Sequence, residues 1–557
     1  MSMQSPPLAS GTPRFNDSKL TELARSQGAL AAWQKAIDTP HPAQAIAEVD
    51  GDFATGFHTA TGSVVLAVDR FAIRTLCYRE VDGELRFASR ADELADASTE
   101  IDPQAIFDYL YFHAIPSPRT IFKGIFRLPP GHYAVWTKGK LDVAPYWQPT
   151  FAEKRDPSFE TLKAEFRNLL VESVGKQLDG SKPACFLSGG TDSSTIAGMI
   201  GQACGAPASS YSIGFEAEGY DEMEFARIAA KQFKTRHHEY YVTPADLVRS
   251  IPSVAAHFDQ PFGNSSVLPS YYCAKMAKED GVSKLLAGDG GDELFGGNTR
   301  YAKQRVFGWY QHLPGPLRRG VMEPLLGTSA ARKLPLLSKA ASYVEQASVP
   351  MPDRLQMYNL IMRLGVQDIL TPGFLSQVDI GAPLKHQQEV WRATPPCSDV
   401  NAQLAFDWRY TLAETDLPKV LGATSAAQVA VGFPFLDRKL LDFSMGLPSD
   451  YKLKGMKLRW FFKEALRGFL PDDIITKKKQ GFGLPFGVWA LRDSALNALA
   501  TDSLHSLSRR GIVRPEFIQS LLAVRLAEHP GYFGEMVWIL MMLEQWLRRH
   551  APNYRLG

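Results

Sequence analysis

Two short segments of the chain place glycine beside serine or aspartate directly after an apolar run. The first is CFLSGGTDSS, in which Ser188, Gly189 and Gly190 are followed by Asp192 and Ser193. Glycines let backbone N–H groups approach phosphate oxygens, and a helix N-terminus behind them favours an anion. A carboxylate there would repel phosphate, so we expect Asp192 to hold Mg²⁺. The segment therefore predicts a site for the phosphates of ATP, although it lacks the GxxxxGK[ST] pattern of Walker A loops.

The second segment is LLAGDGGDELFGG, which contains Gly288, Asp289, Asp292 and Glu293. Ligands of parallel sheets bind at the carboxyl ends of the strands, so we expect these carboxylates to face the same crevice as Asp192. Two carboxylates from different strand ends suit a magnesium ion that bridges phosphates. The spacing does not match an EF-hand calcium loop.

The elements that carry both segments alternate between helix and strand. Apolar spacing predicts helices over residues 159–178, 193–204, 224–233 and 270–281, and strands over 184–187, 209–215, 237–242 and 284–287. This alternation is typical of an α/β fold with a parallel sheet between helices. Beyond residue 300 the pattern is mainly helical.

The front of the chain has a different pattern. Residues 1 to about 20 are expected to form a frayed tail, and the stretch from there to residue 147 is rich in short strands. Turns are predicted at Asp82-Gly83 and at Lys138-Gly139, the second within a hairpin. We therefore expect one domain over residues 1–147, a polar linker, and a second domain over residues 155–557.

Bulk composition excludes several classes of protein. The 557 residues carry a net charge of +2 and are 45% hydrophobic, so no basic field favours nucleic acid. Five widely spaced cysteines without CxxC argue against a disulfide framework or a zinc site and favour a reducing cytoplasm. The N-terminus lacks a signal-peptide apolar region, and no long apolar run predicts a membrane span. The oligomeric state is not encoded in any pattern that we can interpret.

Several motifs together resemble the asparagine synthetase family. They are SGGTDSS, GDGGDELFGG, YSIGFEAEGYDEMEFARIAAKQF, FDQPFGNSSVLPSY, GFPFLDRKLLDF and KKKQGFGLPFGVW, and they occur in the family's order. The resemblance covers nearly all of residues 155–550. It implies a PP-loop ATP pyrophosphatase domain that adenylates a carboxylate with ATP and Mg²⁺.

The resemblance also implies roles for matched residues. Asp192 and Asp292 would be the magnesium carboxylates, and the backbone around Leu187, Ile213 and Gly288 would hold the adenosine.

A second set of matched residues would take part in the chemistry. Lys479, in KKKQGF, would neutralise charge on the α-phosphate and the departing pyrophosphate. We assign Asp289 and Glu293 with Lys479 to the catalytic group.

The front of the chain departs from the family pattern. A complete family member resembles an N-terminal-nucleophile (Ntn) glutaminase fused to the synthetase, with a cysteine as its first residue. Here Ser2 follows the initiator and no cysteine precedes Cys77. Only DGDFATGF and LAVDRFAIRTLCYRE resemble the later half of that domain. We therefore expect residues 1–147 to be a shortened, inactive glutaminase-like domain, with Cys77 in a strand and part of the core.

The acceptor side also departs from the family. By alignment on PFLD, a family glutamate and arginine become Ala430 and Gly432, and a DRMSM-like segment becomes LGATS at residues 421–425. We expect these changes to remove two charges near the substrate pocket, so that the acid is not simple free aspartate.

Four functions are open to a chain with these motifs. We expect a relative of the lasso-peptide macrolactam synthetases, in which a peptide's Asp or Glu side chain is adenylated and a tethered amine attacks. Its partners would be a precursor peptide and leader-processing proteins. The alternative is an ammonia-dependent asparagine synthetase, or amidation of another small acid. A β-lactam synthetase is opposed by Asp289 and Ala430, and a non-catalytic scaffold is opposed by the intact Asp192, Asp292 and Lys479.

Overall fold

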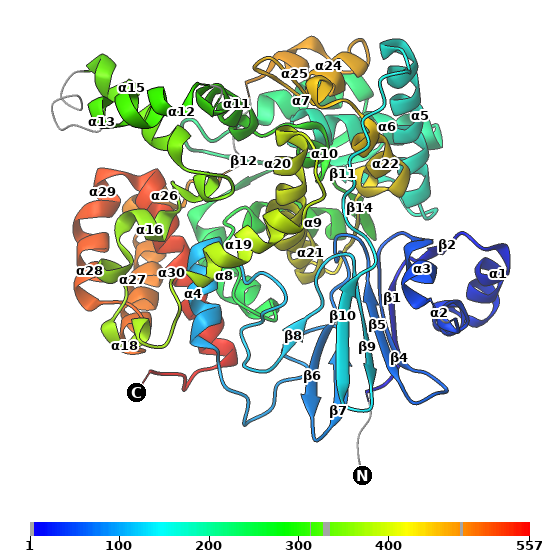
Figure 1. Cartoon of the computed structure of the whole chain (residues 1–557), viewed down its shortest axis with the longest axis horizontal. Helices are drawn as coiled ribbons and strands as arrows, with labels where there is room; N and C mark the ends of the chain where they lie inside the picture. Colours follow the sequence, from blue (N-terminus) through cyan, green and yellow to red (C-terminus); the bar gives the residue numbers. More distant parts are fainter. Residues whose placement is uncertain (1–4, 40, 312, 327–334, 479–482, 557) are drawn as a thin grey trace.

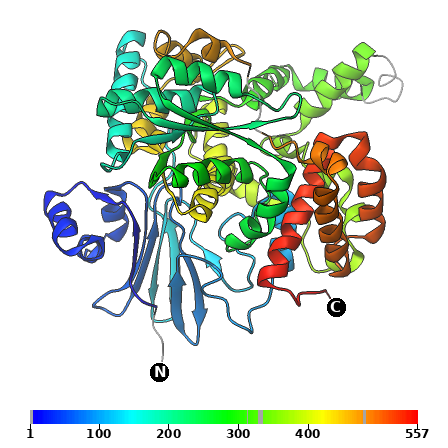
Figure 2. The ribbon, with the colours of Figure 1, turned by 180° about the vertical axis from the view of Figure 1, so that it is seen from behind.

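A computed structural model describes residues 5–39, 41–311, 313–326, 335–478 and 483–556. In Figure 1 the antiparallel strands of the N-terminal part lie below the parallel sheet, and a bundle that includes the C-terminal helix lies to one side. Seen from behind, the long strands of the parallel sheet cross the upper half of the molecule (Figure 2). Within the described ranges, no helix is long and apolar enough to cross a membrane.

The N-terminal part is built from two antiparallel sheets and a small helical layer. The larger sheet has the order β1-β4-β5-β9-β10 and the smaller one β7-β6-β8, with a short pair β2-β3 beside them. The strands are β1 Leu8–Gly11, β2 Arg14–Phe15, β3 Val49–Asp50, β4 Phe53–His58, β5 Val64–Val68, β6 Cys77–Val81, β7 Glu84–Ala88, β8 Phe126–Arg127, β9 His132–Thr137 and β10 Lys140–Pro145. The helices are α1 Ser18–Gln27, α2 Ala29–Ile37 and α3 Pro42–Ala47.

Alternation along the central strands explains why this part has three layers. On β5, Val65 and Ala67 pack with Trp33 of the helical layer, whereas Leu66 on the other face packs with Phe87 of the smaller sheet. Both predicted turns are confirmed, because Asp82-Gly83 and Lys138-Gly139 each supply two positive φ angles between paired strands.

The prediction of a frayed tail over residues 1–20 is wrong for its described part. Leu8–Gly11 pairs antiparallel with β4, and Thr55 Oγ1 donates a hydrogen bond to the carbonyl of Leu8 at 3.1 Å. Ser18 begins α1, which Asp17 caps. The stabilising partners are backbone groups remote in sequence, so local composition gave no sign of them.

The parallel sheet that was predicted is confirmed, with the order β13-β12-β11-β14-β15. Its strands are β11 Ala184–Phe186, β12 Ser209–Phe215, β13 Arg236–Val242, β14 Lys284–Leu286 and β15 Ala430–Gly432. Helices α5 Phe159–Gln177, α6 Thr191–Cys204 and α7 Met223–Phe233 share a core on one face, and α8 Pro244–His257 and α9 Val267–Glu279 share a core on the other. The chain leaves β11 toward β12 and β13 and then returns to β14 on the other side of β11, which makes a topological switch point between β11 and β14.

The remainder of the chain is mainly helical, as predicted. After the second glycine-rich segment come α10 Gly291–Phe295, α11 Thr299–Gln311, α12 Gly315–Leu317, η1 Arg318–Met322, α13 Glu323–Leu326, α15 Pro335–Ser348, η2 Asp353–Gln356, α16 Leu360–Leu364, α17 Val366–Ile369, α18 Pro372–Leu375, α19 Ala382–Ala393, α20 Asp399–Asp407, η3 Trp408–Asp416, a π-helix, and α21 Leu417–Ala426. After β15 come η4 Pro434–Leu436, α22 Arg438–Gly446, α23 Ser449–Lys452, β16 Leu453–Lys454, β17 Lys457–Leu458, α24 Trp460–Ala465, α25 Asp472–Thr476, α26 Phe486–Arg492, α27 Ser494–Arg509, α28 Pro515–Ser520, η5 Leu521–Arg525, α29 Leu526–Glu528 and α30 Pro530–His550.

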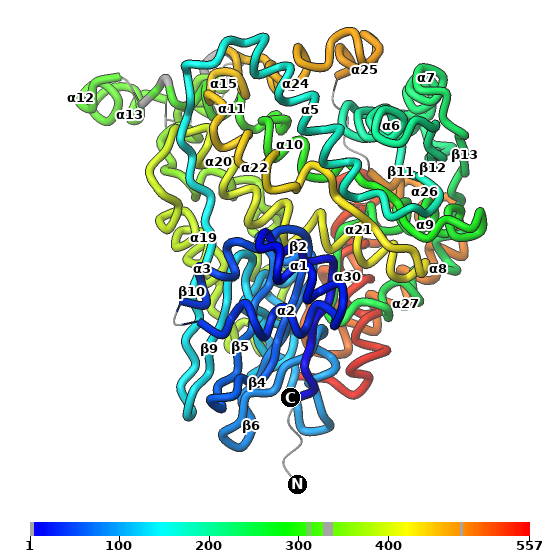
Figure 3. The backbone as a smooth tube through the Cα atoms, turned by 90° about the vertical axis from the view of Figure 1, so that its right-hand side faces the viewer, coloured from blue at the N-terminus to red at the C-terminus, as the bar shows by residue number. Residues whose placement is uncertain are grey.

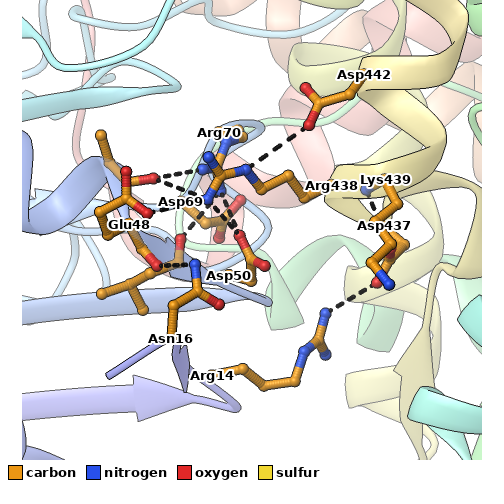
Figure 4. A network of polar contacts seen from close by, with 12 residues as sticks. Arg14, Asn16, Glu48, Asp50, Asp69, Arg70, Asp437, Arg438, Lys439 and Asp442 are labelled. Atoms are coloured by element: carbon orange, nitrogen blue, oxygen red, sulfur yellow. Dashed lines mark hydrogen bonds and ion pairs between the residues drawn. The ribbon is translucent and has the colours of Figure 1, made fainter. Parts of the chain in front are cut away.

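The N-terminal part packs against the rest of the chain through a shared hydrophobic core, a hydrogen bond and ion pairs. Helix α4, Pro103–Phe112, lies in one hydrophobic core with α30, and Tyr109 Oη donates to the carbonyl of Ile539 at 2.8 Å. The side view shows the N-terminal helices and strands packed beneath the upper layers (Figure 3). At that junction Arg14 pairs with Asp437 at 3.2 Å and Arg438 pairs with Asp50 at 3.4 Å (Figure 4). The two parts therefore form one packed body.

Candidate active site

The first glycine-rich segment forms a tight loop between β11 and α6. Gly189 has a φ of +70°, and a Cβ there would lie 2.4 Å from the backbone nitrogen of Ala226, so a larger residue does not fit. The Ser188 N–H donates to Ser193 Oγ at 3.1 Å, which closes the loop. Gly190 precedes α6 without a side-chain cap, so the first N–H groups of the helix stay available to an anion.

The second segment packs against the first through its glycines. A Cβ on Gly288 would lie 2.9 Å from the backbone nitrogen of Ser193. A Cβ on Gly291 would lie 1.9 Å from Oδ1 of Asp192, and one on Gly297 would lie 1.7 Å from Oδ1 of Asp292. These glycines leave the space that the two carboxylates occupy.

A cavity of about 280 Å³ lies at this switch point. Nine of the predicted site residues line it: Leu187, Ser188, Asp192, Ser193, Ile213, Gly288, Asp289, Asp292 and Glu293. Gly189 and Gly190 belong to the loop beside it but are not among its lining residues. The remaining wall includes Tyr211, Ser212, Pro269, Ser270, Cys273, Asp416, Lys419 and Val420. The carboxyl ends of β11 and β14, which carry the two glycine-rich segments, thus meet at this cavity, as expected for a parallel sheet.

Arg459 bridges the two carboxylates that were predicted to hold magnesium. Its Nη1 lies 2.7 Å from Oδ2 of Asp192, 2.8 Å from Oδ1 of Asp292 and 2.9 Å from Oγ1 of Thr191, and its Nη2 contacts the other oxygen of Asp192. The guanidinium stacks on the ring of Phe462 at 3.9 Å and is almost fully buried. No local signal marks Arg459 in the sequence, because it follows both motifs by more than 150 residues.

Magnesium fits this pair in chemistry. Within the described ranges, no group of three or more His, Cys, Asp or Glu side chains could hold a metal ion. Mg²⁺ in phosphate-transfer sites is commonly held by one or two carboxylates together with phosphates and water, which is what Asp192 and Asp292 beside a phosphate loop would provide.

Lys419 is a buried cation in the wall of the cavity, whereas Arg459 contacts Asp192 and Asp292 but is not among the lining residues. Its Nζ lies 3.1 Å from Oδ1 of Asp416 and 3.5 Å from Oδ1 of Asp289. Burial raises the pKa of Asp289, and the charge of Lys419 counteracts that effect. Burial opposes the charge of Lys419 itself, but Asp416 and Asp289 outweigh it and raise the pKa of the amine. Lys419 belongs to none of the predicted site motifs, although its three-residue spacing from Asp416 in a helical stretch is a usable signal.

Glu293 faces a different environment from the other acids. Burial, followed by the charge of Asp292, raises the pKa of Glu293 well above its ordinary value. Its backbone carbonyl accepts a hydrogen bond from the indole nitrogen of Trp408 at 2.9 Å.

Lys479 lies outside the described residues, as do the following Gln480, Gly481 and Phe482, so its role stays a prediction. The preceding described part of the motif reaches the phosphate loop. Lys477 pairs with Glu222 at 2.9 Å and lies over the ring of Phe225, whose backbone adjoins Gly189.

The expectation that Ala430 and Gly432 lie near the substrate pocket stays a prediction. They belong to β15, neither is among the residues that line the cavity, and Ala430 is exposed. A Cβ on Gly432 would meet Gln177, Leu286 and Lys284 instead. The residues of segment 421–425 lie on α21, where Gly422 packs against Phe258.

Cys77 is part of the core, as predicted. It is fully buried in β6, and burial raises the pKa of its thiol far above the ordinary value. A thiol in this state is a poor nucleophile.

Comparison with protein families agrees with this geometry. A family model described as asparagine synthase matches residues 165–548, and one described as a glutamine amidotransferase domain matches residues 39–147. The first covers more than half of the chain, so the chain belongs to the asparagine synthase family. This assignment confirms the α/β synthetase fold with an Ntn-type amidotransferase domain in front. It also makes the chain a ligase of a family that uses ATP to form carbon–nitrogen bonds.

Curated relatives are moderately similar. Asparagine synthetase [glutamine-hydrolyzing] 1 of Bacillus subtilis is 24% identical over 494 residues, which cover 87% of this chain and 75% of the relative. A putative asparagine synthetase [glutamine-hydrolyzing] of Mycobacterium tuberculosis is 27% identical over 447 residues, covering 77% and 66%. Amidase chyE of Penicillium rubens is 23% identical over 495 residues, covering 80% and 71%. The chain thus spans only 66% to 75% of the length of these relatives.

Proposed function

We propose that the protein activates a carboxylate as an acyl-adenylate, with release of pyrophosphate, and then forms an amide with an amine. The observation that carries this proposal is the convergence of Asp192 and Asp292, from two strand ends, on one point beside the Ser188–Ser193 loop. The phosphates of ATP would lie on the N–H groups of that loop, and the adenosine near Leu187, Ile213 and Gly288.

The reaction would proceed in two steps. A carboxylate oxygen attacks the α-phosphorus while its bond to pyrophosphate breaks, and Lys479 stabilises the charge that leaves. Mg²⁺ held by Asp192 and Asp292 would neutralise phosphate charge. An amine then attacks the acyl carbon, AMP leaves, and the amine gives up a proton.

Asp289 is our candidate acceptor for that proton. Lys419 lies beside it and favours its ionised form, which a proton acceptor requires. Glu293, whose pKa is raised by burial, lies on the wall of the same cavity.

We further propose that the amine is not ammonia from the chain's own hydrolysis of glutamine. Cys77 is the first cysteine of the sequence, and its buried thiol lies in β6. A tethered amine removes the need for an ammonia source, because a reacting group held within the same substrate has a high effective concentration. The favoured reaction is therefore macrolactam formation between an Asp or Glu side chain and an amine of one peptide, with a precursor peptide and its leader-processing proteins as partners.

The alternative is amidation of aspartate or another small acid with free ammonia. It is favoured by the relatives named asparagine synthetase. ATP–pyrophosphate exchange separates the two functions, if free aspartate, sugar acids and a precursor core peptide are tested with and without ammonium. Exchange with the peptide alone, and loss of one water from it, supports the macrolactam reaction. Asparagine formed from aspartate and ammonium supports the alternative, and absence of exchange with every acid rejects adenylation.

A matched variant connects the exchange to the site. Asp192→Asn keeps the shape of the side chain but removes its charge, and we expect it to slow exchange by about 10²–10³-fold. Asp179, an exposed acid before β11, provides the control. Asp179→Asn is expected to leave exchange unchanged.

A further inference from the structure

The contacts of Arg459 place a protein cation at the point where the proposed mechanism needs a metal ion. Its Nη1 lies within 2.8 Å of one oxygen from each of Asp192 and Asp292. A Mg²⁺ ion held by the same two carboxylates would compete with the guanidinium for their oxygens, and the two cations would repel one another.

Arg459 is held in an unusual conformation. Its φ is +54°, in the left-handed region that arginine seldom adopts, at the residue before α24. Its Nε is buried and has no hydrogen-bond partner within the described part of the chain. The unsatisfied N–H leaves Arg459 with a donor for a further hydrogen-bond acceptor.

ATP would bring such an acceptor. Arginine binds phosphate through two parallel N–H···O bonds, and the phosphate loop lies next to Asp192. When phosphate oxygens receive the guanidinium, the carboxylate oxygens become available to a metal ion. The metal ion would then replace the guanidinium of Arg459 as the positive charge beside the two carboxylates.

We propose that Arg459 is a positioning residue that fills the cation site between Asp192 and Asp292 until ATP binds, so that the divalent metal binds tightly only together with the nucleotide. This inference rests on the proposed ATP and magnesium site. It adds an order of binding and a reciprocal coupling between metal and nucleotide.

Direct metal binding tests the proposal. Mn²⁺ serves as a spectroscopic probe, and its binding to the full chain is measured by electron paramagnetic resonance with and without α,β-methylene-ATP. We expect the wild-type protein to bind Mn²⁺ at least about tenfold more tightly with the analogue, since repulsion from the buried guanidinium opposes the metal alone. Equal affinity in both conditions would overturn the proposal.

Three variants separate the effect of the Arg459 charge on Mn²⁺ binding from a structural effect of the substitution. Arg459→Met retains an apolar stem on Phe462 and should bind Mn²⁺ without nucleotide at least about tenfold more tightly than the wild type. Asp192→Asn in the same chain should abolish that gain. Lys457→Met removes the same charge from an exposed side chain on β17 and should behave as the wild type does. No gain in Arg459→Met also overturns the proposal.

If Arg459→Met does not fold, Arg459→Gln takes its place in the same comparison, because it removes the charge but retains hydrogen-bond donors for Asp192 and Asp292. Failure of the proposed nucleotide site would appear as no binding of the analogue at any concentration of Mn²⁺, whereas failure of this inference would appear as tight Mn²⁺ binding in the absence of the analogue.

Discussion

The carboxylate of Asp192 occupies the space that a side chain on Gly291 would need, because a Cβ on Gly291 would lie 1.9 Å from Oδ1 of Asp192. Gly291→Ala should therefore displace the carboxylate and lower ATP–pyrophosphate exchange by about 10²-fold or more while the protein still folds. Gly201→Ala on α6 is the control, because the nearest atom to its Cβ lies 4.0 Å away. The control should keep its activity and gain roughly 0.5–1 kcal/mol of stability. Exchange by Gly291→Ala within a few-fold of the wild type would contradict this account of the glycine.

Lys419 should control the ionisation of Asp289. Lys419→Met removes the charge that counteracts burial, so the pKa of Asp289 should rise further and a smaller fraction should be ionised at pH 7. If Asp289 accepts the proton from the amine, the acid limb of the pH profile for amide formation should move to higher pH. Lys419→Arg keeps the charge and should leave that limb in place. A purely structural role for Lys419 would lower the rate without moving the limb.

Because of Lys452, the free energy of unfolding should depend on pH in the alkaline range. It is fully buried, its Nζ donates to Oδ1 of Asn401 at 2.8 Å, and burial lowers its pKa from 10.5 to about 7. The unfolded chain binds the proton more tightly than the folded protein, so stability should rise as pH increases from about 7 to 10.5. The full effect is on the order of 5 kcal/mol. Denaturant unfolding at pH 7 and 9.5 should show a larger gain for the wild type than for Lys452→Met, with exposed Lys457→Met as the matched control.

Glu414 should stabilise the contact between the N-terminal part and η3. It is buried, contacts Arg127 and Arg409, and accepts a hydrogen bond from the Ser117 N–H at 3.1 Å. Glu414→Gln leaves two arginines without a charge partner and should cost roughly 3–5 kcal/mol in unfolding free energy.

The pH dependence gives a second test of Glu414. Burial raises its pKa, but Arg127 and Arg409 outweigh burial, so the folded pKa is lowered. The stability it contributes is present above its unfolded pKa and is lost as pH falls through the folded value, and Glu414→Gln should lack this loss. Glu464→Gln, which affects an ion pair at the surface, should change stability by less than about 1 kcal/mol.

Lys479 remains a prediction from sequence. Lys479→Ala should slow adenylation by about 10²–10³-fold, because a fixed cation near the α-phosphate stabilises the charge of the leaving pyrophosphate. Lys478→Ala removes the same charge one residue earlier and should have little effect. Equal rates in the two variants would mean that Lys479 has no special position.

Much of the site could be predicted because its residues are local to strand ends. Ser188 and Asp192 follow β11, while Asp289 and Asp292 follow β14, and the parallel topology alone places these strand ends at one edge. The glycine positions were equally predictable, since a loop that cradles phosphate requires residues without a Cβ.

Other features depended on contacts between distant residues. Arg459 lies 167 positions from Asp292 along the chain and yet touches it, and β15 pairs with β14 from 146 residues away. The strand of residues 8–11 exists because β4 offers a free edge, and its own composition is typical of a tail.

The sequence by itself determined which residues gather around the phosphates, because their chemistry and spacing are properties of short segments. Only the tertiary structure decided which cations neutralise those acids. Arg459 and Lys419 come from elements whose approach is fixed by packing, and burial of a charge is tolerated only where opposite charges from other elements meet it. The place of Ala430 was likewise decided by the tertiary structure, since its pairing with Lys284 joins residues far apart in the sequence.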